Sequence, residues 1–90
     1  MHIESKIKEY IATNLLFSPE GFNYPDNASF LKEGIIDSIG VMELVSFVQT
    51  TFKIDVDQDE VTPNNFDSVA GLAAYVRRKQ TTGKPVTPSP

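Results

Sequence analysis

Apolar residues recur at helical spacing in three stretches of the chain. Residues 3–16 carry them mostly at intervals of three and four with charged residues between, which predicts an amphipathic helix ending between residues 16 and 18. Residues 38–52 have the same pattern and predict a central helix, and residues 67–79 predict a last helix that begins at Asp67-Ser68. The buried face of the central helix is expected to consist of Val41, Leu44, Val45, Val48 and Phe52.

The segment between the first two helices is too rich in apolar residues to be a simple linker. Residues 18–33 contain prolines and glycine, which break regular structure, together with Phe22, Tyr24, Phe30 and Leu31. A long loop in a small domain is usually functional or packed by its own side chains. We therefore expect these side chains to fold back over the bundle, with a short helical turn around residues 29–32.

Residues 54–61 alternate apolar and acidic residues, a pattern that also fits a β-strand. No second segment of the chain offers a partner strand, so we favour extended backbone that buries Ile54 and Val56. An acidic cap at Asp57 or Asp59 and one short helix over residues 60–66 are expected to follow.

These elements predict an all-α fold, a small four-helix bundle with three main helices, one short helix and a long first loop. Ninety residues that are 40% apolar support a single modest core. The domain is expected to span residues 1–79, and the polar, proline-rich residues 80–90 are expected to form a disordered tail. With no long apolar run and no secretory leader, we expect a cytoplasmic monomer without a membrane span.

Charge and cysteine content narrow the classes of function. The formal net charge is −4; acids concentrate in residues 31–67, whereas every charged residue from 68 onward is basic. An acidic middle argues against a nucleic-acid surface and favours protein partners with basic faces. The basic cluster at 77–79 is expected to suit the end of its helix. The absence of cysteine excludes disulfides and a Cys-ligated metal site, and no metal site is expected.

Residues 34–44, Gly-Ile-Ile-Asp-Ser-Ile-Gly-Val-Met-Glu-Leu, carry the main chemical signal. Asp37 is expected to cap the central helix, which places the Ser38 hydroxyl at the rim of the helix start. Free N–H groups and the helix dipole favour a phosphate there. Plain capping is the alternative interpretation of Asp-Ser. Ile39 and Met42 lie off the buried face, which indicates either a docking surface or deeper burial.

In the order and spacing of these features the chain resembles the acyl carrier proteins over residues 3–79. Gly34-Ile-Ile-Asp-Ser-Ile39 matches the Asp-Ser-Leu attachment motif of that family, with Ile39 in the place of leucine. Further similarity lies in Glu43-Leu44, Phe52, the acidic segment 54–60 and the last helix from residue 66 to 76.

The resemblance implies a carrier protein and not an enzyme. It implies that a phosphopantetheinyl transferase attaches 4′-phosphopantetheine from coenzyme A to Ser38 through a phosphodiester. Acyl or aminoacyl groups would then be carried as thioesters, supplied by a loading ligase and passed to synthase enzymes of fatty-acid, polyketide or related biosynthesis. The arm would provide the thiol that this cysteine-free chain lacks.

The resemblance also assigns roles to residues around Ser38. Recognition by the transferase and partner enzymes falls to Asp37, Ile39, Met42 and Glu43. A pocket for the acyl group between the second and third helices would be lined by Ile36, Met42, Val45, Val61 and Phe66, although ordinary core contacts are the favoured explanation for these residues.

One departure from the family concerns partner choice. Many fatty-acid carriers have several acids on the second helix, whereas this helix has only Glu43. A specialised stand-alone carrier for an unusual acyl chain, a polyketide starter or an amino acid therefore fits as well as a fatty-acid carrier.

Two other classes of protein share features of this sequence. Residues 55–59 resemble the start of an EF-hand calcium loop, but Glu60 stands where glycine is needed and Phe66 where the loop needs a bidentate glutamate. A helical adaptor without a prosthetic group, binding a partner through Ile39, Met42 and Phe47, is the second alternative.

Overall fold

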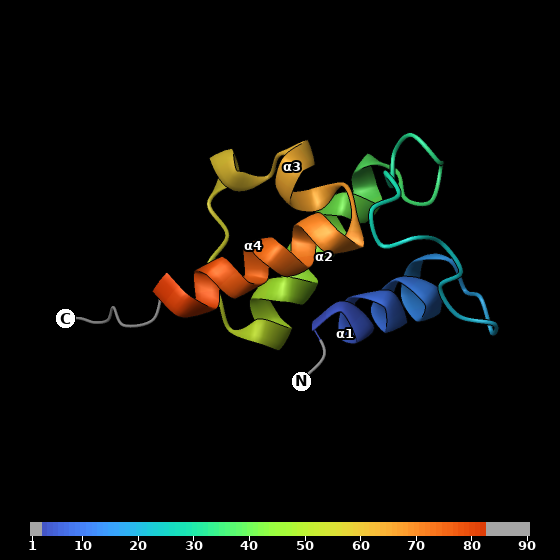
Figure 1. The fold of residues 1–90 in the computed structure, drawn as a ribbon, viewed down its shortest axis with the longest axis horizontal. Helices are drawn as coiled ribbons and strands as arrows, with labels where there is room; N and C mark the ends of the chain where they lie inside the picture. Colours follow the sequence, from blue (N-terminus) through green and yellow to red (C-terminus); the bar gives the residue numbers. More distant parts are fainter. Residues whose placement is uncertain (1–2, 83–90) are drawn as a thin grey trace.

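The computed structural model describes residues 3–82, without the side chain of Thr82. Its elements are α1 (Ile3–Tyr10), the π-helical turn η1 (Ile11–Leu15), α2 (Ser38–Phe52), the 3₁₀ turn η2 (Gln58–Glu60), α3 (Pro63–Phe66) and α4 (Val69–Thr82), as Figure 1 shows. Within residues 3–82 there is no β-strand. The predicted all-α fold, with three main helices and a long first loop, is confirmed.

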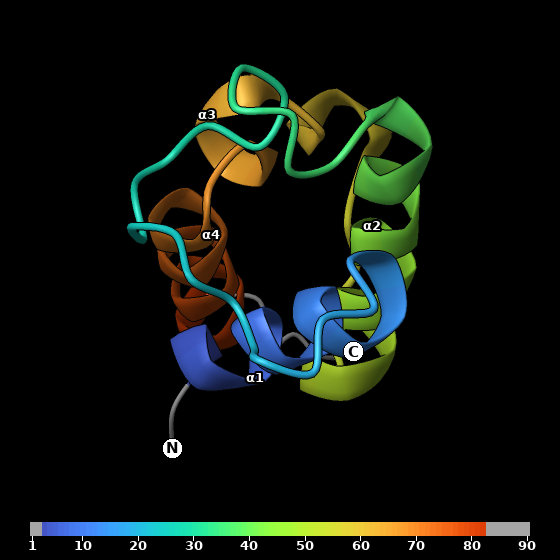
Figure 2. The same ribbon diagram turned by 90° about the vertical axis from the view of Figure 1, so that its right-hand side faces the viewer.

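The core lies between the three long helices, and α4 packs against both α1 and α3 (Figure 2). Ile7 and Ile11 enter it from the first helix, and Phe30 fills it from the long loop. The remaining fully buried side chains are Leu44 and Val48 of α2, Phe66 of α3, and Val69, Leu72, Ala73, Tyr75 and Val76 of α4, and Ile3, Ile35 and Ile36 are nearly buried. Burial of these side chains is the main force that holds such a small bundle together.

Helix α2 begins and ends where the sequence predicted. Its buried face differs at two positions, because Gly40 is buried while Val41 is only half-buried. A Cβ atom on Gly40 would lie 2.2 Å from Cγ2 of Ile36, so the glycine lets the segment before the helix pack directly on its first turn. At the other end, Lys53 ends the helix in the left-handed conformation with φ of 58°.

The first helical segment ends at Leu15, just before the predicted end, and its last part is the π-helical turn η1, which the sequence did not predict. After η1 the chain turns at Phe17, whose φ is 51°, and the Ser18 N–H donates to the Ala12 carbonyl at 2.8 Å. This bond reaches six residues back, one more than the bond of a Schellman motif, because it follows the wider π-helical turn η1. The left-handed residue just before the donor is a feature that it shares with that motif. The position usually holds glycine, and here it holds a phenylalanine that is 78% exposed.

The last helix is longer than predicted. It runs past Lys79 to Thr82, because no helix-breaking residue occurs in the sequence before Gly83. The rest of the predicted tail, residues 83–90, lies outside the described residues, so its disorder stays a prediction.

The three basic residues of α4 tie the helix to other elements. Arg77 donates two hydrogen bonds of 2.8 Å to the carboxylate of Glu4 in α1. Arg78 donates to Asn65, and Lys79 donates to Glu60 at 3.1 Å. The expectation that they merely suit the end of the helix was therefore incomplete.

The long loop folds back on the bundle, as predicted, but only part of its apolar content is covered. Phe30 is fully buried and Phe22 packs at the edge of the core, whereas Tyr24 and Leu31 remain exposed. The middle of the loop is attached to the first turn of α4, because the Ala70 N–H donates to the Asp26 carbonyl at 2.8 Å. The expected burial of Tyr24 and Leu31 was wrong.

Residues 54–66 form two short turns where one helix was expected. Ile54 is buried and Val56 half-buried, as extended backbone requires. Thr62 then returns to an extended conformation (φ −125°, ψ 162°) before Pro63 begins α3. Proline disfavours helical backbone in the residue that precedes it, which explains the break.

None of the helices in residues 3–82 is long and apolar enough to cross a membrane.

Candidate attachment site at the start of α2

Ser38 is the first residue of α2 and is exposed. The preceding Asp37 is extended (φ −95°, ψ −176°), and its Oδ1 accepts from the Gly40 N–H at 2.9 Å, which is the geometry of an N-cap. The predicted cap is confirmed. Its carboxylate is directed along the helix toward Gly40, so Asp37 fixes where the helix starts and therefore where the Ser38 hydroxyl lies.

An apolar hollow of about 230 Å³ opens beside Ser38, between α2 and the segment that contains α3. Its floor is formed by Phe66, which is only 2% exposed. Leu31 and Met42 line it but are 51% and 58% exposed, so they stand at its mouth. The remaining lining residues are Val41, Val61, Thr62, Pro63 and Asp67.

The structure separates the residues that the sequence suggested for an acyl pocket. Met42, Val61 and Phe66 line the hollow next to Ser38. Ile36 and Val45 do not line it and belong to the buried core cluster. Ile36 lies against Gly40, on the side of the helix start where a second hollow includes Leu15 and Asp37.

The residues suggested for partner recognition do not share one face. Ile39 is 72% exposed and Met42 is also largely exposed, which favours a docking surface over deeper burial. Glu43 instead interacts with Tyr10 of α1. Burial raises the pKa of Tyr10, and the charge of Glu43 and a hydrogen bond to it raise that pKa further. Glu43 is thus directed toward α1, whereas Met42 borders the hollow near α3.

Sequence reasoning missed the role of Asp67. It was expected to start the last helix with Ser68, but Ser68 alone caps that helix, because its Oγ accepts from the Gly71 N–H at 2.9 Å. The carboxylate of Asp67 accepts instead from the Leu31 N–H at 3.0 Å and from the Ser29 hydroxyl. No sequence signal distinguishes these two uses of an Asp-Ser pair.

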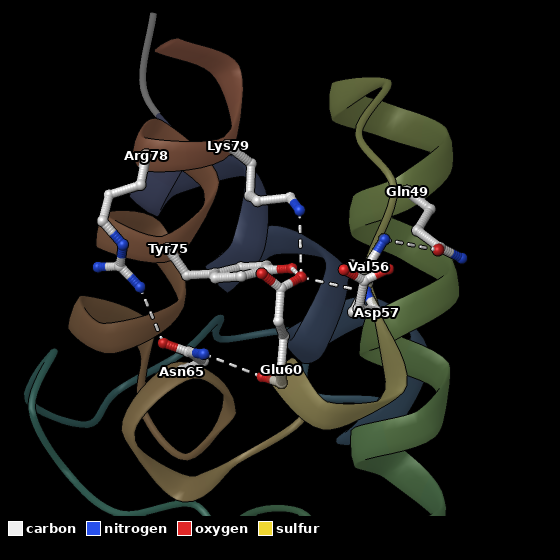
Figure 3. Close-up of polar contacts among 8 residues, drawn as sticks. All are labelled: Gln49, Val56, Asp57, Glu60, Asn65, Tyr75, Arg78 and Lys79. Carbon is white, nitrogen blue, oxygen red and sulfur yellow. Dashed lines mark hydrogen bonds and ion pairs between the residues drawn. The ribbon is translucent and has the colours of Figure 1, made fainter. Parts of the chain in front are cut away.

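A cluster of polar side chains joins residues 57–65 to α4 (Figure 3). The Glu60 carboxylate accepts from the Tyr75 hydroxyl at 2.7 Å, from the Asp57 N–H at 3.1 Å and from Lys79. The amide of Asn65 donates to the Glu60 carbonyl at 2.9 Å. Residues 57–65 include Val61, Thr62 and Pro63, which line the hollow, so the cluster fixes these three residues relative to α4.

The electrostatics of this cluster follow from its hydrogen bonds. The bond from Tyr75, and then those from the Asp57 N–H and Lys79, lower the pKa of Glu60. Burial, followed by the bond to Glu60, raises the pKa of Tyr75 above its usual value. Of the acids that suggested an EF-hand, Asp57 is the N-cap residue of η2 and its N–H is bonded to Glu60. Residues 3–82 contain no group of three or more ligating side chains placed to hold a metal ion.

These features fit a phosphopantetheine group attached to Ser38. A serine at a helix N-terminus is exposed to another enzyme, and backbone N–H groups without intrahelical partners favour a phosphate there. The neighbouring apolar hollow could shelter part of the group or its cargo.

Comparison with known proteins defines the class as one that carries 4′-phosphopantetheine. The family described as "Phosphopantetheine attachment site" matches residues 5–76. The chain is also 30% identical over 76 residues to "Probable acyl carrier protein PigG" of Serratia sp. (strain ATCC 39006), an alignment that covers 84% of this chain and 86% of that protein.

The chain belongs to the acyl carrier protein family. Proteins of this family are carriers and not enzymes, and they hold 4′-phosphopantetheine covalently. Membership sets aside the adaptor without a prosthetic group, because the attached group defines the family.

Proposed function

We propose that Ser38 is the attachment point of 4′-phosphopantetheine and that the chain presents acyl or aminoacyl groups to the enzymes of a biosynthetic pathway. The observation that carries this proposal is the position of Ser38, exposed at the capped start of α2 and at the edge of an apolar hollow. The phosphopantetheine arm, when attached, supplies a thiol on which the cargo is held as a thioester.

Attachment requires a second protein. A phosphopantetheinyl transferase joins the Ser38 Oγ to the phosphate of the arm, adenosine 3′,5′-bisphosphate leaves coenzyme A, and the serine proton passes to the transferase. Asp37 contributes by fixing the helix start, because its carboxylate is committed to the Gly40 N–H. It does not act as a base toward Ser38, since a carboxylate next to a serine does not by itself create a nucleophile.

Partner recognition is proposed to combine one apolar and one acidic contact. Ile39 and Met42 provide exposed apolar surface next to Ser38. Asp37 and Glu43 add negative charge, which suits a basic face on the transferase, the loading ligase and the downstream synthase. Because Glu43 is directed toward α1, a partner that contacts both Glu43 and the apolar Met42 must span the width of α2.

The test of this proposal is the intact mass of the protein after incubation with coenzyme A and a phosphopantetheinyl transferase. Wild type is expected to gain the mass of one arm, and Ser38→Ala none. Ser46→Ala is the matched control, because Ser46 is an exposed serine on the same helix, and it should be modified like wild type. Unmodified wild type, or a mass gain on Ser38→Ala, would overturn the assignment.

A further inference from the structure

We propose that Leu31, held in place by a clamp of Ser29 and Asp67, sets the upper size limit of the cargo and restricts it to short apolar acyl groups. The inference rests on the proposed function, because it concerns the group carried on Ser38. It assigns a specificity role to a loop residue that lies outside α2 and α3.

The clamp fixes the backbone on both sides of Phe30. Oδ1 of Asp67 accepts from the Leu31 N–H at 3.0 Å, and the other carboxylate oxygen accepts from the Ser29 hydroxyl. The Phe30 N–H donates to the Asp67 carbonyl at 2.7 Å, and Ser29 Oγ accepts from the Lys32 N–H at 3.1 Å. Hydrogen bonds to a charged carboxylate are stronger than neutral ones, so this turn is firmly attached to the start of α4.

Burial of Phe30 adds to the clamp. Its side chain is fully buried in the core, and its carbonyl accepts from the N–H groups of Ile35 and Ile36 at 2.8 and 3.2 Å. The turn cannot withdraw from the hollow without pulling Phe30 out of the core. Leu31 therefore forms a fixed wall, although its own side chain is half exposed.

The floor of the hollow is equally fixed. The Phe66 ring packs against the Tyr75 ring, with centroids 5.3 Å apart, and the Tyr75 hydroxyl is bonded to Glu60. The hollow cannot deepen unless this cluster moves. Its volume of about 230 Å³ lies below the roughly 300–1,000 Å³ of pockets that enclose drug-sized ligands. A short acyl chain fits such a space, whereas a long one must project past Leu31 and Met42 into water.

Side-chain chemistry agrees with an apolar cargo. The carboxylate of Asp67, the one charged group in the lining, has both oxygens occupied by the clamp. Its charge is thereby partly satisfied by groups of the protein itself. Val41, Val61, Pro63 and Phe66 offer no partner to a polar cargo, and the hydroxyls of Ser38 and Thr62 are the other polar side-chain groups of the lining.

The experiment measures how well each acyl group is sheltered. A transferase that accepts acyl-coenzyme A loads acetyl, butyryl, hexanoyl, octanoyl and dodecanoyl groups, and intact mass follows cleavage of each thioester by hydroxylamine. On wild type we expect cleavage to slow about twofold to fourfold for each methylene that the hollow still accommodates. The protection of the thioester against cleavage should stop increasing between the hexanoyl and the octanoyl group.

Variants at the wall should move this limit. Leu31→Ala is expected to shift it to a longer chain and Leu31→Phe to a shorter one, while Phe17→Ala, which removes another exposed apolar side chain away from the hollow, should reproduce the wild-type profile. Ser29→Ala loosens the clamp and should shift the limit in the direction of Leu31→Ala. Circular dichroism confirms that each variant is folded, which is expected because Leu31 and Ser29 are not in the core.

The outcomes separate this inference from the proposed function. Loading of Ser38 followed by cleavage rates that do not depend on chain length, or by the same limit in all variants, overturns the role of Leu31 and leaves the carrier assignment intact. Sheltering that continues to increase up to dodecanoyl also overturns it. Failure of wild type to load overturns both.

Discussion

The hydroxyl of Tyr75 in α4 donates a 2.7 Å hydrogen bond to Oε1 of Glu60, at the end of η2 (Figure 3). The same bond lowers the pKa of Glu60 and, after burial, raises that of Tyr75, so it keeps the carboxylate charged and the phenol neutral. It connects the last helix to the segment that forms one wall of the hollow beside Ser38.

Replacing Tyr75 by Phe should therefore weaken the fold without emptying the core. The ring still packs on Phe66, but a hydrogen bond to a charged group is lost, at a cost of about 1.5 kcal/mol in unfolding free energy, the lower end of the usual range because Glu60 keeps other partners. Urea denaturation measures the change. Tyr24→Phe, at an exposed tyrosine, is the control and should leave stability unchanged; an equal effect of both would contradict the role of the bond.

The pair between Glu4 and Arg77 predicts a dependence of stability on pH. The hydrogen bonds from Arg77 lower the pKa of Glu4 from 4.5 to about 2. A carboxyl whose pKa is lower in the folded state stabilises the fold above the unfolded value, and this contribution is lost as the pH falls toward the folded one.

Glu4→Gln should consequently be less stable than wild type near neutral pH, and the difference should vanish by about pH 2. The difference is expected to be small, because both side chains are partly exposed to water. Urea midpoints at several pH values test this, with Glu9→Gln, an exposed acid of the same helix, as control. A difference that persists at the lowest pH would show that the effect does not come from the charge of Glu4.

Loss of the cap at Asp37 should affect both stability and modification. Asp37→Ala leaves the Gly40 N–H without its side-chain acceptor and is expected to cost about 1 kcal/mol. If Asp37 also helps the transferase to dock, the rate of arm attachment should fall by more than this loss of folded protein explains. Rates measured by mass spectrometry at a temperature where both proteins are fully folded decide the point, and equal rates would remove the docking role while leaving the cap.

Replacing Phe17 by glycine is expected to increase the stability of the fold. An L-residue in the left-handed conformation costs roughly 1–2 kcal/mol, whereas glycine adopts it freely. Phe17→Gly should raise the unfolding free energy by about 0.5–1 kcal/mol, after subtraction of the larger unfolded-state entropy of glycine. Phe17→Ala keeps the Cβ atom and should bring no such gain. If the two variants unfold at the same urea concentration, the backbone conformation is not the source of strain.

The central helix was predictable because its signals are local. Asp37 caps it, the apolar spacing runs through to Phe52, and nothing elsewhere in the chain is needed to place its ends. The resemblance of Gly34-Ile-Ile-Asp-Ser-Ile39 to an attachment motif likewise depends on neighbouring residues alone. Family and fold could therefore be inferred from the sequence.

The lining of the hollow could not be predicted, because it depends on contacts between distant segments. Asp67 and Ser68 form the same dipeptide as Asp37 and Ser38, yet Asp67 bonds to a loop 36 residues away. That bond brings Leu31 to the hollow, while Val45, which the sequence suggested, lies in the core. Helical periodicity identifies a buried residue but does not distinguish a wall from a packed interior.

The bidentate contact of Arg77 with Glu4 joins α4, the last helix, to α1, the first. During synthesis on a ribosome, α1 emerges well before the helix against which Ile3 and Ile7 are buried. The nascent chain must therefore keep these isoleucines exposed until α4 has left the exit tunnel. A product cut short before α4 would lack the buried side chains of Val69, Leu72, Tyr75 and Val76 and would be a ready substrate for cellular proteases.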